Sequence, residues 1–357
     1  MSVSETVREN KFLFIGIAIL AVFFIISLFY WIYLFYFISP GLKADLIDNT
    51  NKINQIKKYP YYSYLNGHGL VDKNLQSPNT VAVMIDNFPG ARPQIGINNA
   101  SIVYEVLAEG GVTRFMAIFD QATLVEMVGP VRSARPYFFD WLAEYGDPIY
   151  MHSGGSPQAL KILKNSNIFD TDEFAYGGYY WRDYNYTAPH NLFTSSQNWQ
   201  KLHINFGQKR TSSTWQGWRF GKLTTTSTDN AKTVSIKYSV NNIVRWDYSS
   251  VNKNYNRFIN NTVHSSEKEG KITTKNIVVQ FVPTVTIDEI GRRKLTTTGS
   301  GEVRVLRDGK IVRGTWKKTT PSSRTRFYDR VGQEIELSAG KTWVEIVPSG
   351  TELVLGN

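Results

Sequence analysis

The stretch that decides the fold is VGPVRSARPYFFDWLAEYGDPIYMHSGGSP, Val128–Pro157. Apolar residues recur at helical spacing over Ala134–Gly146, and the final glycine predicts that a helix ends there. The short apolar run PIYMHS then predicts a strand. Ser156 followed by Pro157 is typical of the N-cap and first position of a further helix. Strands that alternate with helices in this way predict an α/β domain.

The same pattern extends over residues 80–220. VAVMID, Val81–Asp86, is a continuous apolar run, as expected of a strand buried on both faces. Two further apolar segments, ASIVYEVLAEGG and VTRFMAIFDQ, are separated by Gly110 and Gly111, which indicate a turn. TSSQNWQKL, Thr194–Leu202, predicts another capped helix. We therefore predict an α/β domain with a mixed sheet over these residues.

Residues 221–357 carry a different pattern. Helical periodicity disappears, and short alternating segments such as KTVSIKYS, NIVRWDYSS and NYNRFIN follow one another. Asp308 and Gly309, between EVRVLR and KIVRGTW, are a turn pair that hairpins favour. This half is predicted to be an antiparallel β-rich domain, so the predicted fold class is α+β.

The strongest hydropathy signal lies near the N-terminus. FLFIGIAILAVFFIISLFYWIYLFYFIS, Phe12–Ser39, carries no charge and is long enough to span a bilayer as a helix. Its aromatic residues cluster toward one end, as in the aromatic belts of membrane interfaces. A cleaved signal peptide has a shorter apolar region. We therefore predict a transmembrane signal anchor, after a cytoplasmic tail of residues 1–11. Residues 40–79 would follow as a stalk or linker, or would already pack on the folded domain.

The charges that flank this span do not by themselves give the orientation. Two precede it and four follow it: Arg8, Lys11, Lys43, Lys52, Lys57 and Lys58. This count opposes an external C-terminal region, but long translocated domains often ignore the bias. We favour a single-pass protein of the cell membrane whose C-terminal domains lie outside the cytoplasm.

Composition narrows the classes of function. The chain has 357 residues, a formal net charge of +10 and no cysteine. Disulfides, thiolate metal sites, a cysteine nucleophile and lipidation of an N-terminal cysteine are therefore excluded. The positive charge suits acidic partners. Because basic and acidic residues are interleaved without a dense basic block, a nucleic-acid partner is not expected.

Several long motifs resemble the YerB-like family, known as domain of unknown function 3048, which has an N-terminal and a C-terminal part. They include VAVMIDNFPGARPQ, ASIVYEVLAEGGVTRFMAIF, VGPVRSARPYF, YMHSGGSPQAL, APHNLFTS, GSGEVRVLRDGKIVRGTW and GKTWVEIVP. The resemblance covers residues 80–348. It implies a bacterial protein of the cell envelope, on the outer side of the cytoplasmic membrane, and no established activity. Familiar members are lipoproteins with an N-terminal cysteine, which this chain lacks.

The layout is also similar to that of the LytR–CpsA–Psr enzymes, which move polymers from polyprenyl pyrophosphate to peptidoglycan. The corresponding segments here would be VMIDN, VTRFM, VGPVRSARP and HSGGSPQAL. The Pro-Arg-Asp signature of those enzymes is missing, because Arg135 is followed by Pro136. The likeness is therefore one of layout.

Three arginines are the candidate ligands for an anion: Arg114, Arg132 and Arg135. The planar guanidinium group suits phosphate and never deprotonates. Predicted helix starts after Ser133 and Gly155 would direct backbone N–H groups at the same ligand. The resulting ligand-binding set is Arg114, Arg132, Arg135, Ser153, Gly154, Gly155 and His190.

The candidate catalytic residues are Asp86, Glu105 and His152. Asp86 and Glu105 could hold Mg²⁺ through carboxylate oxygens or assist an acceptor hydroxyl, with the arginines stabilising the transition state. His152 or His190 could act as the base instead. The alternative is structural: the arginines would pair with Asp86, Glu105 or Asp140, the histidines would be hydrogen-bonded loop residues, and the glycine pairs would be turns.

Three functions remain open from the sequence. The first is an envelope protein that binds an anionic component, such as a lipid-linked or peptidoglycan-type ligand. The second is a Mg²⁺-dependent phosphotransferase or hydrolase acting on a lipid-pyrophosphate-linked glycan. The third is a non-catalytic scaffold for other envelope proteins. Unpaired acids near the arginines would favour the enzyme, whereas fully paired arginines would favour a binding protein or a scaffold.

Overall fold

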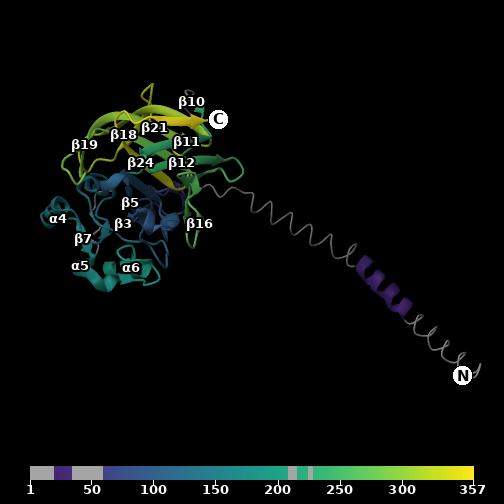
Figure 1. Cartoon of the computed structure of the whole chain (residues 1–357). Helices are drawn as coiled ribbons and strands as arrows, with labels where there is room; N and C mark the ends of the chain where they lie inside the picture. Colours follow the sequence, from purple (N-terminus) through teal and green to yellow (C-terminus); the bar gives the residue numbers. More distant parts are fainter. Residues whose placement is uncertain (1–19, 34–58, 208–214, 224–227) are drawn as a thin grey trace, which may run out of the picture. The chain divides into compact units, whose positions relative to one another are not determined.

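A computed structural model describes residues 20–33, 59–207, 215–223 and 228–357, and its contacts divide the chain into two units, Met1–Lys58 and Tyr59–Asn357 (Figure 1). Residues 20–33 form a helix. The rest of the predicted anchor, the predicted tail and residues 40–58 of the predicted stalk lie outside the described residues. Within the described ranges, no helix has both the length and the apolar character needed to cross a bilayer.

The second unit is built on one mixed sheet of eleven strands. In spatial order these are β10 (Thr228–Asn230), β22 (Lys310–Lys318), β21 (Gly299–Arg307), β18 (Asn276–Val282), β24 (Thr342–Pro348), β4 (Ile102–Leu107), β5 (Thr113–Asp120), β3 (Thr80–Asp86), β6 (Ile149–His152) and β7 (Phe169–Asp172), with β23 (Arg326–Asp329) on β22. Strands from both predicted domains therefore share a single sheet. They meet where β24 pairs in parallel with β4.

A second, antiparallel sheet has six strands. These are β14 (Thr262–Val263), β13 (Asn254–Ile259), β12 (Asn242–Ser249), β11 (Thr233–Ser239) and β25 (Leu353–Gly356), with β17 (Thr273–Thr274) on β13. Four two-stranded hairpins complete the strands assigned in the described residues: β1/β2 (Tyr61–Tyr62, Gly69–Leu70), β8/β9 (Trp181–Arg182, Leu192–Phe193), β15/β16 (Ser265–Ser266, Gly270–Lys271) and β19/β20 (Thr284–Thr286, Arg293–Leu295). The predicted α+β class, with a mixed sheet and antiparallel sheets, is confirmed.

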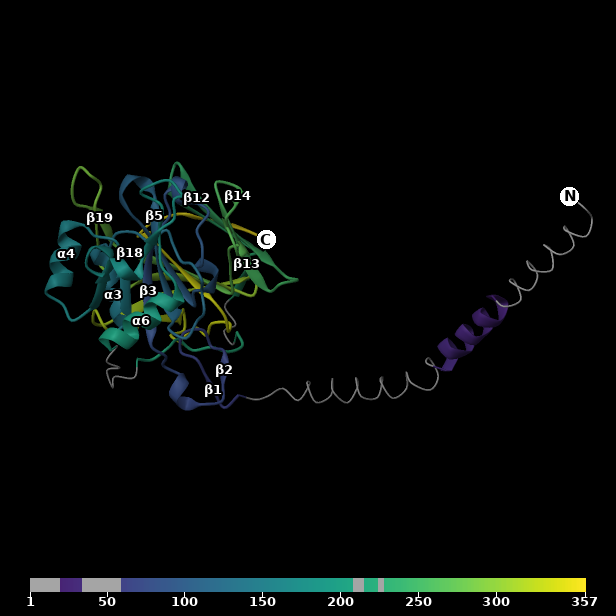
Figure 2. The same ribbon diagram turned by 90° about the horizontal axis from the view of Figure 1, so that it is seen from below.

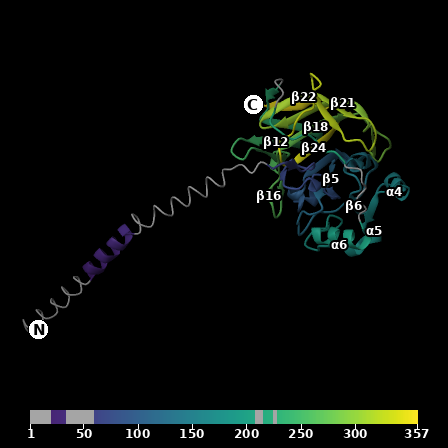
Figure 3. The same cartoon turned by 180° about the vertical axis from the view of Figure 1, so that it is seen from behind.

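Short helices fill the connections of the N-terminal half. The α-helices are α3 (Phe139–Leu142), α4 (Pro157–Lys164), α5 (Glu173–Tyr176) and α6 (Ser196–Phe206). The 3-10 turns are η2 (Lys73–Leu75), η3 (Pro89–Ala91), η4 (Ile97–Asn99), η5 (Glu109–Gly111), η6 (Pro136–Phe138), η7 (Ala143–Tyr145) and η8 (Gly177–Tyr179). Figures 1 and 3 show α4, α5 and α6 at the end of the unit opposite to the strands β18 and β21.

Strand β3 lies between two hydrophobic cores. Its alternate residues Val81, Val83 and Ile85 belong to one core, and Ala82 and Met84 to the other, because successive side chains of a strand point to opposite faces. All seven residues of β3 are buried, as the apolar run predicted. The α6 helix packs on the first core and the η6–α3–η7 segment on the second.

Local signals in the sequence match the observed element ends. Ser156 caps α4 by accepting a hydrogen bond from the Ala159 amide, and Ser195 caps α6. The predicted helix after Ala134 is an irregular run of 3-10 and α turns that ends at Gly146, which has a φ of 75°. Asp308 and Gly309 form the predicted hairpin turn between β21 and β22, both with positive φ.

Residues 59–79 pack on the folded unit. Leu65 is fully buried in the same core as Trp218 and Phe220. The amide of Tyr64 donates to the carbonyl of Gln76, which closes this segment on itself. Of the two alternatives left open by the sequence for residues 40–79, packing on the domain holds for the described part.

Candidate functional site

The candidate site lies at the carboxyl end of β3, where Asp86 ends the strand. One oxygen of its carboxylate, Oδ2, forms an ion pair with Arg132 Nε at 3.0 Å and a hydrogen bond with His190 Nδ1 at 2.8 Å. The other, Oδ1, accepts from the Phe88 amide at 3.1 Å. We call this group, together with Arg92 and Arg114, the Asp86 corner: Asp86, Phe88, Arg92, Arg114, Arg132 and His190.

Backbone pairing brings these residues together from distant parts of the sequence. The amide of Arg132 donates to the Met84 carbonyl, and the amide of Asp86 donates to the Pro130 carbonyl, so the Val128–Pro157 stretch begins beside the end of β3. Arg114 stands opposite Asp86 in the register of β3 and β5. His190 comes from the loop before β9, and its ring stacks on Phe88 with centroids 5.2 Å apart.

Positive charge exceeds negative charge at the Asp86 corner. Burial and then the charge of Arg257 lower the pKa of Arg92 to about 10, while burial and then the charge of Arg135 lower the pKa of Arg114. Both arginines also feel the carboxylate of Asp86. Asp86 acts on Arg92 and Arg114 besides pairing with Arg132, while Glu105 also acts on Arg92 and Glu109 on Arg114. An added anion would reduce the repulsion among the guanidinium groups.

The corner is open to solvent on one side. The side chain of Arg132 is 30% exposed, and Phe88 is 47% exposed. Within the described part of the chain, Arg132 Nη1 and Nη2 have no hydrogen-bond partner, since only its Nε is engaged by Asp86. Two donors in the geometry that suits phosphate or carboxylate are therefore free.

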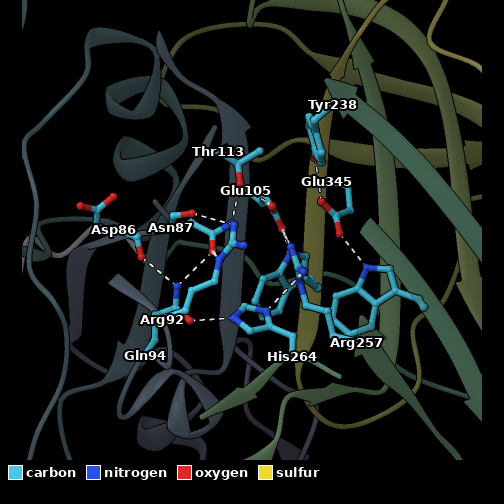
Figure 4. Close-up of polar contacts among 12 residues, drawn as sticks. Asp86, Asn87, Arg92, Gln94, Glu105, Thr113, Tyr238, Arg257, His264 and Glu345 are labelled. Carbon is cyan, nitrogen blue, oxygen red and sulfur yellow. Dashed lines mark hydrogen bonds and ion pairs between the residues drawn. The ribbon is translucent and has the colours of Figure 1, made fainter. Parts of the chain in front are cut away.

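Behind this corner, six buried side chains form a closed hydrogen-bonded ring (Figure 4). We call it the buried ring: Asn87, Gln94, His264, Arg257, Glu105 and Thr113. Asn87 Nδ2 donates to Thr113 at 2.7 Å, and Thr113 donates to Glu105 Oε1 at 2.6 Å. Arg257 donates to Glu105 Oε2 and, at 3.3 Å, to His264 Nδ1. The Gln94 amide joins His264 to Asn87, at 2.7 and 3.0 Å.

The ring fixes the tautomer of its histidine. Arginine can only donate, so His264 Nδ1 accepts and Nε2 carries the proton that goes to Gln94. Burial, followed by the charge of Arg257, lowers the pKa of His264 well below its usual value, which keeps the ring neutral. Arg257 also lies over the Trp343 ring, 5.0 Å from its centroid. The buried ring thus joins the two halves of the sequence.

A second glutamate, Glu345, lies beside Glu105 in the parallel pair β24 and β4. It accepts from Trp246 Nε1 and from the Tyr238 hydroxyl, both at 2.7 Å. Burial, and then the charge of Glu105, raise the pKa of Glu345 to about 8. Glu345 therefore keeps its proton near neutral pH, while Glu105 forms the ion pair with Arg257.

The predicted Mg²⁺ ligands do not fit a metal. Every carboxylate oxygen of Asp86 and Glu105 already accepts from N–H or O–H donors, and an arginine lies against each carboxylate. In the ranges that the structure describes, no three His, Cys, Asp or Glu residues are grouped to hold a cation. Glu105 is also fully buried. It does not fit the predicted catalytic role, because no ligand can reach it.

The other predicted residues lie in a separate network at the end of β6. His152 is fully buried, with Nδ1 at 2.8 Å from the Gly154 carbonyl and Nε2 at 2.6 Å from Asp170. The Ser153 hydroxyl donates to Glu173, and the Gly154 amide donates to Asp172 at 2.7 Å. These donors, which we expected to bind an anion, are already occupied by carboxylates of the chain. Gly155 pairs with Ala134 in an isolated bridge.

Arg135 is paired within the chain. Its Nε and Nη2 donate to the two oxygens of Glu109 at 2.7 and 2.8 Å. Burial alone would lower the pKa of Arg135, but the hydrogen bonds and charge of Glu109 raise it. The structural alternative that the sequence left open therefore describes Arg135, with Glu109 as its partner.

Sequence reasoning missed Arg92, Arg257 and Glu345. A signal was present for Arg257: in NYNRFIN it occupies an inward position of an alternating strand, between Tyr255 and Ile259. A charge at such a position indicates a buried partner. Nothing in the sequence named Glu105, 152 positions away, as that partner.

Comparisons with known proteins give one consistent result. Residues 65–210 match the domain described as "Protein of unknown function (DUF3048) N-terminal domain", and residues 234–344 match the corresponding C-terminal domain. A protein of Bacillus subtilis (strain 168) named "Putative lipoprotein YerB" is 33% identical over 278 residues, which are 75% of this chain and 81% of that protein. The crystal structure of the YerB protein from Bacillus subtilis superposes with a TM-score of 0.74 at 29% identity, covering 83% of this chain and 100% of that one.

Proposed function

This chain belongs to the YerB-like family of DUF3048 proteins, and we propose that it is an envelope protein that binds an anionic group at the Asp86 corner. The observation that carries the proposal is the half-open guanidinium of Arg132, which is held by Asp86 through Nε and leaves both Nη atoms free. His190 and Phe88 form the other wall. A phosphate or carboxylate group is the chemistry that this arrangement suits.

The relatives and the N-terminal sequence support a proposal for the place of action. The Bacillus subtilis relative is named as a lipoprotein, which implies attachment to a membrane. This chain has no cysteine to lipidate, so we propose that the uncharged segment Phe12–Ser39 attaches it instead, with residues 59–357 outside the cytoplasm. The ligand would then be an anionic component of the envelope, such as a lipid-linked pyrophosphate.

A second candidate function is hydrolysis or transfer of the bound phosphate ester. The hydrogen bond from His190 Nδ1 to Asp86 favours it, because a carboxylate in this position orients an imidazole and leaves Nε2 to accept a proton. The enzyme would work without the metal considered from the sequence. Release of phosphate from a short prenyl pyrophosphate by the wild type, but not by His190→Asn, would establish it; equal background rates would dismiss it.

The binding proposal is tested by thermal unfolding of the full-length chain in nonionic detergent, with inorganic pyrophosphate in one series and farnesyl pyrophosphate in another. A ligand at one hundred times its Kd stabilises the folded state by about 2.7 kcal/mol. Arg132→Gln should lose the part of this stabilisation that binding at the Asp86 corner contributes. Arg245→Gln is the matched control, because Arg245 is also about one third exposed and paired with an aspartate, on β12.

The two series separate the sources of the anion. Stabilisation by both ligands identifies the phosphate group as what is recognised, and a larger effect of the prenyl compound adds a contribution of the lipid. No stabilisation by either compound, or an equal loss in Arg132→Gln and Arg245→Gln, would refute the Asp86 corner as the binding site.

A further inference from the structure

A cavity of about 20 Å³ lies where the N-terminus of α4 meets the β19/β20 hairpin. Figures 1 and 2 both show β19 next to α4. Arg135, Tyr137 and Ser156 line it from the N-terminal half of the sequence, and Arg293 lines it from the hairpin. It is separate from the open side of the Asp86 corner, since none of Arg132, His190 and Phe88 lines it.

The polar groups that line this cavity include two without partners. Tyr137 is 6% exposed, and its hydroxyl has no hydrogen-bond partner. Arg293 Nε is likewise buried and unpartnered. Buried polar atoms of folded proteins are nearly always satisfied, so two of them at one cavity indicate that something polar occupies it.

The charge around the cavity is positive. Arg135 is neutralised by Glu109, and Arg292 by Asp288, whose Oδ2 lies 2.5 Å from its Nε. Among the described residues, Arg293 has no carboxylate partner, and its Nη1 reaches only the Thr286 hydroxyl at 3.5 Å. Burial raises the pKa of Tyr137 to about 12, and the charge of Glu109, which also lines the cavity, acts in the same direction; the charges of Arg114, Arg135 and Arg293 act in the opposite direction. The occupant should therefore be an anion.

The first turn of α4 adds a free donor. Ser156 caps the Ala159 amide at 3.3 Å and Pro157 has no N–H, so the Gln158 amide is the remaining donor of this turn without a partner inside the helix, as far as the described residues show. Gln158 lines the same cavity. The partial positive charge of a helix N-terminus also favours an anion there.

We propose that this cavity is a second binding site, for the oxygens of a phosphate group. The Tyr137 hydroxyl, the Arg293 guanidinium and the Gln158 amide would donate to it. A volume of about 20 Å³ holds one or two oxygen atoms. One or two oxygens of the phosphate group therefore lie in the cavity, and the rest of the ligand lies on the solvent side. The site takes phosphate monoesters or the end of a diphosphate.

Calorimetric titration of the full-length chain in nonionic detergent with inorganic phosphate, at constant ionic strength, tests the proposal. Two bound phosphates per chain are expected, one here and one at the Asp86 corner. Tyr137→Phe and Arg293→Gln should each weaken one of them by about tenfold or more, because each removes a hydrogen bond to a charged group. Lys294→Gln is the control on the same hairpin, since Lys294 is exposed and does not line the cavity.

The variants keep the two proposals apart. Loss of one phosphate in Tyr137→Phe and Arg293→Gln, and of the other in Arg132→Gln, supports both. If only Arg132→Gln loses binding, the cavity holds water and this inference is wrong, while the Asp86 corner stands. If only the cavity variants lose binding, the Asp86 corner is wrong. No heat at millimolar phosphate, or an equal loss in Lys294→Gln, overturns the cavity site.

Discussion

The buried ring and the Asp86 corner each contain a carboxylate paired with an arginine, but the two pairs differ in exposure to solvent. In the buried ring Glu105 and Arg257 are both fully buried, and their charges neutralise each other. At the Asp86 corner a carboxylate that is 3% exposed meets an arginine that is 30% exposed, with two further arginines nearby. The difference teaches that solvent access and charge balance decide which carboxylate–arginine pair can meet a ligand. Residue type alone does not.

The two regions are nevertheless connected. Asn87 and Gln94 of the buried ring belong to the loop that carries Phe88 and Arg92 of the corner. Gln94 Nε2 also donates to the carbonyl of Asp86 at 2.9 Å. The ring therefore holds the loop from behind, and we interpret it as the support that positions the Asp86 corner.

The largest expected effect is that of Arg257→Ala. It leaves Glu105 as a buried carboxylate without a countercharge, which should lower the free energy of unfolding by about 3–5 kcal/mol. Urea denaturation of the full-length chain followed by tryptophan fluorescence measures this change. A decrease in the free energy of unfolding of less than about 1 kcal/mol would mean that the buried ring does not hold the two halves of the sequence together.

A double variant sharpens that experiment. Glu105→Gln/Arg257→Met removes both charges and should recover much of the stability lost in Arg257→Ala, since uncharged replacements of a buried pair are often tolerated. The matched surface control, Arg245→Ala, breaks the pair with Asp247 and should cost less than about 1 kcal/mol.

The next effect is the pH dependence contributed by Glu345. Its pKa is raised from 4.5 to about 8 in the folded chain, so between these values the native state keeps a proton that the unfolded state has lost. Stability should therefore fall as pH rises through this range, by up to about 1.4 kcal/mol per pH unit.

Glu345→Gln isolates this contribution. Because burial lowers the pKa of His264 in the folded chain, its contribution to stability increases with pH up to about 6.5. Burial lowers the pKa of Lys341 to about 7, so its contribution increases with pH above about 7. Both act in the opposite direction to Glu345, so the difference between wild type and variant is the useful quantity. A difference that stays constant from pH 5 to 8 would contradict a protonated Glu345.

A small effect on stability, about 1 kcal/mol, is expected of Arg132→Gln, because the pair with Asp86 is partly solvated. The same change should abolish binding at the Asp86 corner, as proposed above. A large loss of stability without loss of binding would contradict this view. It would mean that the pair of Arg132 and Asp86 stabilises the fold and does not bind the ligand.

The sequence by itself determined the local elements. Four features could be predicted from residues a few positions apart, because such short-range patterns are visible in the sequence. They are the burial of β3 on both faces, the Ser156 cap of α4, the Asp308–Gly309 turn and the strand character after residue 221. The family was also recognisable from its motifs. Asp86, Arg114, Arg132 and His190 were named as candidates and lie together in the structure.

Only the tertiary structure decided which candidates are available to a ligand. Glu105 and Asp86 end up in different surroundings because β24 brings Trp343 against the first, and β13 brings Arg257 there, from more than 150 positions away. The Ser153 hydroxyl and the Gly154 amide are occupied by Glu173, the first residue of α5, and Asp172, the last residue of β7. The ion pairs, the burial and the net charge of a site depend on residues that are distant in the sequence. Only the tertiary fold decides which of those residues become neighbours.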